Sequence, residues 1–99
     1  MEDIFYFEYG QNRRVKLVAT TGTWYLSSSM KSLEKQMQSY GFLVPHKSFL
    51  VNPEQILSFG AEIEMKNHEM IPIAKNRRKQ VHEQISAYLH NSLNINWRD

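Results

Sequence analysis

Short runs of aromatic and β-branched residues, separated by turn residues, fill most of this chain and indicate a mainly β fold. The first run, residues 4–9, is almost continuously apolar, which predicts a strand buried on both faces. Further strands are predicted at residues 14–20, 23–26, 56–59, 62–66 and 70–73. Asn67 and His68 fit a tight hairpin turn, since Asn tolerates positive φ. Pro72 lacks an N–H group and should therefore lie on an edge strand.

Two other segments carry the spacing of an amphipathic helix. For the first helix, Ser28 or Ser29 is the candidate N-cap, and Gly41 is placed to end it. Its buried face should consist of Met30, Leu33, Met37 and Tyr40. For the last helix, Asn76 is the candidate N-cap. Its buried face should consist of Val81, Ile85, Tyr88 and Leu89. The predicted order is β-β-β-α-β-β-β-α with antiparallel pairing.

The length and composition restrict the class of protein. Ninety-nine residues form one domain, residues 1–99, with a core at about 3–89 and a weakly patterned tail at 91–99. The absence of cysteine excludes disulfides and zinc-finger thiolates and suits a reducing cytoplasm. No apolar run approaches the roughly 20 residues needed to span a bilayer, and the acidic start does not resemble a signal peptide. We therefore expect a cytoplasmic protein without a membrane segment.

Reactive side chains are not arranged as in an enzyme. The only aspartates, Asp3 and Asp99, are terminal, and no glycine-rich phosphate loop is present. The four histidines, His46, His68, His82 and His90, lack the spacing of a metal pair. Residues 27–29, three serines, suit helix capping better than nucleophilic catalysis. We expect no catalytic residue, no metal and no cofactor.

A net charge of +2 conceals two clusters that hold seven of the twelve basic residues. The first cluster consists of Arg13, Arg14 and Lys16, and the second of Lys75, Arg77, Arg78 and Lys79. The second cluster surrounds the predicted start of the last helix, where the helix dipole disfavours cations by a few tenths of a kcal/mol each. A locally unfavourable charge pattern at a helix N-terminus indicates an anion-binding surface. The alternative is two solvated turns whose side chains lie along the helix.

Three segments resemble the LytTR family of DNA-binding domains. The most specific is His46-Lys47-Ser48-Phe49-Leu50-Val51-Asn52. Residues 3–8 resemble the opening strand of that family, and residues 71–75 resemble the segment before its last helix. The resemblance covers most of residues 3–89. It implies an elongated, mainly β fold of small, mostly antiparallel sheets, with about ten short strands in three sheets and two short helices. It also implies a role in bacterial transcription regulation as the output domain of a two-component response regulator.

The resemblance further implies that three loops enter the major groove of double-stranded DNA: residues 10–14, 46–48 and 75–78. Two of these loops coincide with the basic clusters found from charge alone. By position, Lys47 and Lys75 are candidate base readers, assisted by Asn12 and Asn76. Candidate phosphate contacts are Arg13, Arg14, Arg77 and Arg78. Ser48, in the central loop, is a further candidate for DNA binding without an assigned role. For His46, donation to a phosphate and orientation of the loop remain equal alternatives.

The family pattern is not matched throughout. Val44 and Pro45 replace the usual arginine-containing pair before the histidine, and Lys75 replaces a common arginine. Lysine cannot form the two-pronged contact that arginine makes with guanine, so the DNA sequence bound could differ there.

The expected partner is double-stranded DNA at direct-repeat promoter sites, with a second copy on the adjacent repeat. A missing N-terminal receiver domain is compatible with the sequence, because no internal aspartate could accept a phosphoryl group. One alternative is an RNA or single-strand binding module that stacks bases on Tyr9, Trp24 or Tyr25. Their strand positions predict at least partial burial. The other alternative is a protein- or membrane-surface interaction module that uses the basic clusters.

Overall fold

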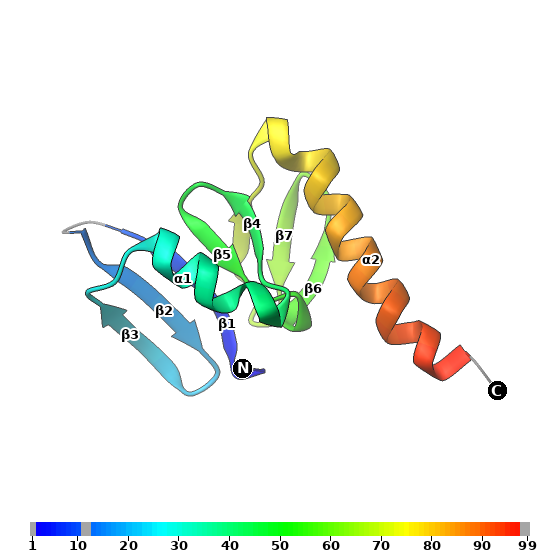
Figure 1. The fold of residues 1–99 in the computed structure, drawn as a ribbon, viewed down its shortest axis with the longest axis horizontal. Helices are drawn as coiled ribbons and strands as arrows, with labels where there is room; N and C mark the ends of the chain where they lie inside the picture. Colours follow the sequence, from blue (N-terminus) through cyan, green and yellow to red (C-terminus); the bar gives the residue numbers. More distant parts are fainter. Residues whose placement is uncertain (1, 11–12, 98–99) are drawn as a thin grey trace.

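The computed structural model describes residues 2–10 and 13–97, with side chains described up to residue 91. Within this range, eight strands form two antiparallel sheets, and two α-helices and several 3-10 turns complete the fold (Figure 1). The molecule is elongated, with principal extents of 50 × 30 × 26 Å. These features confirm the mainly β, elongated fold. The described strands number eight in two sheets, where the family resemblance implied about ten in three.

The larger sheet has the strand order β3-β2-β1-β5-β4. Its strands are β1 (Ile4–Tyr9), β2 (Val15–Ala19), β3 (Gly22–Leu26), β4 (Leu43–His46) and β5 (Phe49–Val51). The central strand β1 pairs with both β2 and β5. Phe5, Tyr6 and Phe7 are consecutive in β1 and all buried, which confirms the prediction of burial on both faces.

The smaller sheet contains β6 (Ile56–Phe59), β7 (Glu62–Met65) and β8 (Met70–Pro72), in that order. Pro72 lies on the edge strand β8, as its missing N–H requires. In the turn between β7 and β8, positive φ occurs at His68 (71°) rather than at Asn67. The Asn67 side chain instead accepts a hydrogen bond from the N–H of Glu69 at 3.1 Å, which fixes the turn in another way.

Helix α1 (Met30–Met37) is capped as predicted, because the Ser29 hydroxyl accepts the N–H of Ser32 at 3.0 Å. A 3-10 turn, Gln38–Tyr40, follows, and Gly41 at φ 79° ends it. Leu33 and Met37 are buried, and Met30 packs partly against the same cluster. Tyr40 is 52 % exposed, because the tighter 3-10 turn rotates it away from the predicted apolar face.

Helix α2 (Arg78–Trp97) begins after a 3-10 turn, Lys75–Arg77, and continues into the segment predicted as a tail. Asn76 lies inside the turn, and Ala74 precedes it without a capping side chain, so the prediction of Asn76 as N-cap was wrong. Val81 and Ile85 are buried, as predicted. Leu89 is 45 % exposed, although it lines a pocket beside β6.

Two clusters of buried side chains share β1 and β5. One contains Phe5, Tyr6, Val18, Leu43, Val51, Ile63, Met65, Ile71, Ile73, Val81 and Ile85. The other contains Phe7, Val15, Leu33, Met37, Phe42 and Leu50 and lies under α1. Since Leu50 and Val51 are adjacent in β5 yet belong to different clusters, this short strand is covered on both faces. Phe49, the first residue of this strand, is half-buried.

Candidate nucleic-acid interface

The first two predicted DNA-contacting loops are joined by the pairing of β1 with β5. The backbone N–H of Tyr9, at the end of β1, donates to the carbonyl of Ser48 at 2.8 Å. One residue further, the N–H of Gly10 donates to the carbonyl of Arg14 at 2.9 Å and closes the base of the first loop. Gly10 and Arg14, at the base of the first loop, and the turn at residues 46–48 therefore lie at the same end of the larger sheet.

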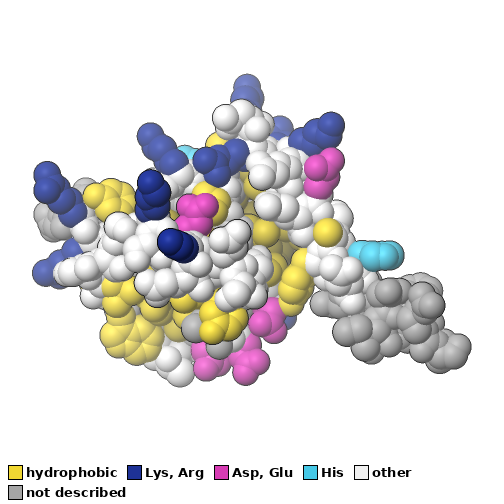
Figure 2. All heavy atoms as spheres, viewed as in Figure 1, with side chains coloured by type: hydrophobic (Ala, Val, Ile, Leu, Met, Phe, Trp, Pro, Cys, Tyr) yellow, Lys and Arg dark blue, Asp and Glu magenta, His cyan; other side chains and the backbone are white. Residues whose placement is uncertain are grey.

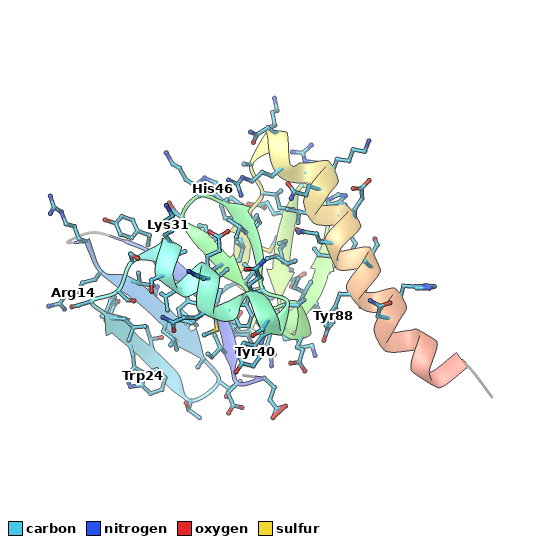
Figure 3. All side chains as sticks on the ribbon, in the orientation of Figure 1. Arg14, Trp24, Lys31, Tyr40, His46 and Tyr88 are labelled. Carbon is cyan, nitrogen blue, oxygen red and sulfur yellow. The ribbon has the colours of Figure 1, made fainter. Side chains whose placement is uncertain are left out.

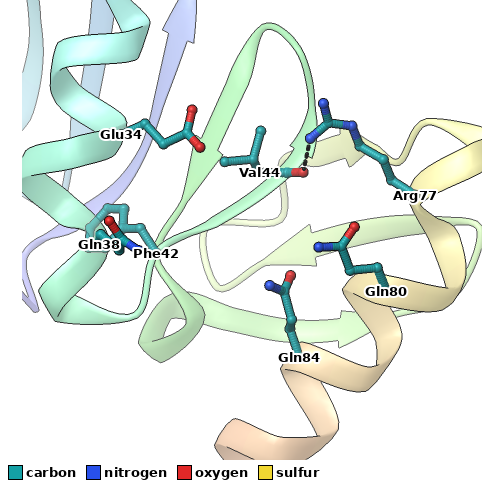
Figure 4. A pocket seen from close by; sticks show the side chains of 7 residues that line it. All are labelled: Glu34, Gln38, Phe42, Val44, Arg77, Gln80 and Gln84. Carbon is teal, nitrogen blue, oxygen red and sulfur yellow. Dashed lines mark hydrogen bonds between the residues drawn. The ribbon is translucent and has the colours of Figure 1, made fainter.

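The second and third loops are joined by two hydrogen bonds across β4. The backbone N–H of Ala74 donates to the carbonyl of Pro45 at 2.9 Å. The Arg77 side chain donates from Nη1 to the carbonyl of Val44 at 3.0 Å (Figure 4). The structure therefore gathers Gly10, Arg13 and Arg14 of the first loop with residues 46–48 and 75–78 along one border of the molecule, the upper border in Figure 1. We call this border the loop edge.

Most of the predicted site residues at the loop edge are exposed: Arg13, Arg14, Lys47, Lys75, Asn76 and Arg78. His46, Ser48 and Arg77 are half-buried. Asn12 lies outside the described residues. Arg13 adopts a left-handed backbone conformation, φ 57°, which costs a non-glycine residue about 1–2 kcal/mol. Glycine would adopt this conformation with less strain.

His46 has a defined tautomer when neutral. Its Nδ1 accepts the N–H of Ser48 at 3.1 Å, which closes the turn that carries Lys47. The ring also meets Phe49 edge-on, with centroids 5.9 Å apart. Because Nδ1 is the acceptor, the single proton of a neutral imidazole lies on Nε2, which is a hydrogen-bond donor. One side chain can therefore both orient the loop and donate to a ligand.

Arg77 differs from the other predicted phosphate contacts because part of its guanidinium already binds the protein. Its bond to the Val44 carbonyl holds the 3-10 turn against β4. Val44 and Pro45 stand where the family pattern has an arginine-containing pair, so they lack its side-chain contacts. In the structure, both residues instead accept hydrogen bonds through their backbone carbonyls. No side-chain pattern could have revealed this, since every residue has a carbonyl group.

The surface charge is unevenly distributed. Figure 2 shows lysine and arginine side chains along the loop edge and a group of acidic side chains at the opposite, lower border, with other acidic side chains nearer the loop edge. Hydrogen bonds to backbone carbonyls hold the acidic residues Glu2 and Asp3 at the lower border. The carbonyl of Asp3 accepts a hydrogen bond from the N–H of Thr20, and the carbonyl of Glu2 accepts one from the side chain of Gln55. Within the described residues, the ion pair found is His68–Glu64, so the cations of the loop edge are not neutralised by carboxylates there.

The aromatic side chains on the larger sheet are partially buried, as predicted, yet a large part of each ring is exposed. Trp24 is 48 %, Tyr25 is 62 % and Tyr9 is 41 % exposed. Trp24 and Tyr25 lie on β3, which is an edge strand, so one side of the strand has no neighbour to cover them. Consecutive residues of a strand point to opposite faces, so these two rings do not form one stacking platform.

A polar cavity of about 240 Å³ lies between α1 and α2, behind the loop edge (Figure 4). Its lining consists of Glu34, Gln38, Phe42, Val44, Arg77, Gln80 and Gln84. This volume is below the roughly 300–1,000 Å³ typical of small-molecule sites. In the part of the chain that the structure describes, no three acidic or histidine side chains are grouped to hold a metal ion. The same part contains no helix with the length and apolar character needed to cross a lipid bilayer.

The antiparallel β fold and its basic border of loops define a nucleic-acid-binding module that has no recognition helix among its described elements. The model of the LytTr DNA-binding domain matches residues 1–86, and the chain belongs to this family. A solved structure, the LytTr DNA-binding domain of a Bacillus cereus protein described as a methyl-accepting/DNA response regulator, is similar in fold. The TM-score is 0.72 at 19 % identity, over 84 % of this chain and 81 % of that one. No curated protein gives a significant match.

Proposed function

We propose that this protein is a cytoplasmic transcription regulator that binds double-stranded DNA sequence-specifically through the loop edge. The proposal rests on two backbone hydrogen bonds, from Tyr9 to Ser48 and from Ala74 to Pro45, which bring the three loops together. Residues far apart in the sequence thereby form one convex, basic border. Such a border suits the major groove, whose base edges are read by side chains while phosphates set the register.

Separate roles follow from the exposure and bonding of each residue. Lys47, at the tip of the turn, and Lys75, at the start of the 3-10 turn, are exposed and are assigned to base edges. Arg13, Arg14 and Arg78 are assigned to phosphates, because their chain positions flank these tips. Asn76 is exposed beside Lys75 and is assigned an assisting role at adenine.

The regulatory setting rests on family membership and on the similar Bacillus cereus domain, which is described as part of a response regulator. We propose that this chain acts as the output domain of a similar two-component system. On promoter DNA, two copies would occupy adjacent direct repeats.

The test is selection of binding sites from a random duplex pool. The selected duplex and random DNA would then be compared by fluorescence anisotropy at several salt concentrations. Specific recognition predicts at least ~10³-fold tighter binding to the selected duplex. Weak binding that disappears with salt and enriches no sequence would contradict the proposal.

Single-strand binding is the second candidate, because Trp24 and Tyr25 are exposed. Base stacking on either ring predicts that Trp24→Ala or Tyr25→Ala weakens binding of an oligo(dT) strand by about 1–3 kcal/mol. Unchanged affinity for the strand in both variants would remove this candidate. Duplex selection and strand binding are independent measurements, so they separate the two functions.

A further inference from the structure

The start of helix α1 lies beside the loop edge. In the register of the larger sheet, Leu26 at the end of β3 pairs with Val15, the residue after Arg14. Only residues 27–29 separate Leu26 from α1, so the first helical residue is within about 14 Å of Leu26. Figure 3 shows Lys31, in this first turn, between Arg14 and His46.

The position of Lys31 has no stabilising explanation within the described fold. Its side chain is exposed, and the first turn of α1 contains no acidic residue. A cation at this end opposes the helix dipole, whereas Lys35 in the last turn of the same helix is favoured by it. No ion pair with Lys31 occurs within the described residues. The charge of Lys31 is therefore available to an external anion.

We propose that Lys31 is a phosphate contact of the DNA complex, a fourth element beside the three loops. This inference rests on the proposed DNA binding and extends its surface from the loops onto α1. The pairing of β2 with β3 that holds the first loop also sets the start of α1 near it. A DNA sugar-phosphate backbone that passes Arg14 and the His46 turn would therefore run past Lys31 (Figure 3). A point charge on a flexible stem suits a phosphate rather than a base edge.

The experiment compares Lys31→Ala with Lys35→Ala, one helical turn further from the loop edge, and with Lys66→Ala. Lys66 lies at the opposite border, where its N–H donates to the carbonyl of Gln55. Affinities for the selected duplex and for random DNA would be measured between 50 and 200 mM salt. Lys31→Ala should reduce the slope of log Kd against log salt concentration by about 0.9. The ratio of its Kd to that of the wild-type protein should therefore change about 3.5-fold between the two salt concentrations. Specificity should be unchanged.

Lys31→Glu distinguishes lost binding from lost folding. An acid in the first turn interacts favourably with the helix dipole, so the urea midpoint should be equal to or above that of wild type while DNA affinity falls further than in Lys31→Ala. Lys66→Ala should match wild type, and Lys35→Ala should change the slope by less than half as much. An unchanged slope in Lys31→Ala, or equal effects in Lys31→Ala and Lys35→Ala, would overturn the inference while leaving the proposed function intact. Failure of the wild-type protein to bind DNA would overturn both.

Discussion

Individual side chains at the loop edge divide into those that hold the loops and those that remain available to DNA. Arg77 and His46 hold the backbone, the former through the carbonyl of Val44 and the latter through the N–H of Ser48. The side chains of Lys47 and Lys75 are exposed and make no hydrogen bond or ion pair within the described residues. Charge alone did not separate these groups, because the sequence presents all of the basic residues alike.

Lys47→Ala and Lys75→Ala should each cost about 1–3 kcal/mol on the selected duplex and relax preference at one base pair. The reason is that each substitution removes a contact to a base edge, which differs from one base pair to another, rather than a contact to a phosphate, which is the same at every position. Anisotropy titrations on the selected duplex and its single-base variants measure this. Equal losses on selected and random DNA would assign the lysine to a phosphate instead.

His46→Asn separates the two roles that the sequence left open. An asparagine side chain can accept the N–H two residues later, so it preserves the turn, but it removes the Nε2 donor. If the donor contacts DNA, His46→Asn should bind several-fold more weakly, with the turn unchanged in amide NMR spectra. Binding equal to wild type would assign His46 to loop orientation alone, and His46→Ala would then be the weaker variant.

Among the elements, β4 and the 3-10 turn before α2 decide whether the loops form a single border. The link uses the backbone of Ala74 and Pro45 and the side chain of Arg77. The 3-10 turn lacks a capping side chain, and Asn76 does not provide one. The tertiary contact to β4 therefore does the positioning that a local cap would otherwise do.

Ala74→Pro tests this link directly. Ala74 has φ −61°, which proline adopts without strain, but the substitution removes the N–H that donates to Pro45 and places the ring Cδ against that carbonyl, so the link has to open. DNA affinity for the selected duplex should fall several-fold, because the third loop is no longer fixed to the second. Circular dichroism should show the fold retained. Ala74→Gly, which keeps the N–H, is the control and should bind like wild type; wild-type affinity of Ala74→Pro would show that the link is dispensable.

Arg77→Ala and Arg78→Ala should differ in their effect on the free energy of unfolding. Arg77→Ala removes a charge-assisted bond to a half-buried carbonyl and should cost about 1.5–3 kcal/mol in urea denaturation. Arg78 is exposed, so Arg78→Ala should stay within about 0.5 kcal/mol of wild type while weakening DNA binding. Equal stability of the two variants would contradict the structural role of Arg77.

At the scale of the whole molecule, two buried clusters are joined through shared strands. Phe5 and Tyr6 belong to one cluster and Phe7 to the other, although they are neighbours in β1. The same division separates Val51 from Leu50 in β5. Neither cluster can lose these strands alone, so we expect the described fold to unfold as one cooperative unit.

Leu50→Ala and Ile85→Ala test this cooperativity from opposite clusters. Both side chains are 1 % exposed, and each substitution should cost about 2–5 kcal/mol. In urea titrations followed by amide NMR, the signals of Leu33 and Val81 should lose intensity at the same midpoint in each variant. Two separate midpoints would show that the clusters unfold independently.

The sequence was sufficient to predict the types of most secondary-structure elements and their positions, and to identify the basic residues of two loops. Apolar periodicity, the Ser29 cap and Gly41 are local properties, so α1 and six of the eight described strands were predictable, whereas β4 and β5 were missed. Only the tertiary structure decided that the loops meet, that Arg77 binds a carbonyl and that Trp24 is exposed. These outcomes depend on strand order and on backbone hydrogen bonds between distant residues. Every residue offers the same carbonyl, so no side-chain pattern encodes which distant partner it will find.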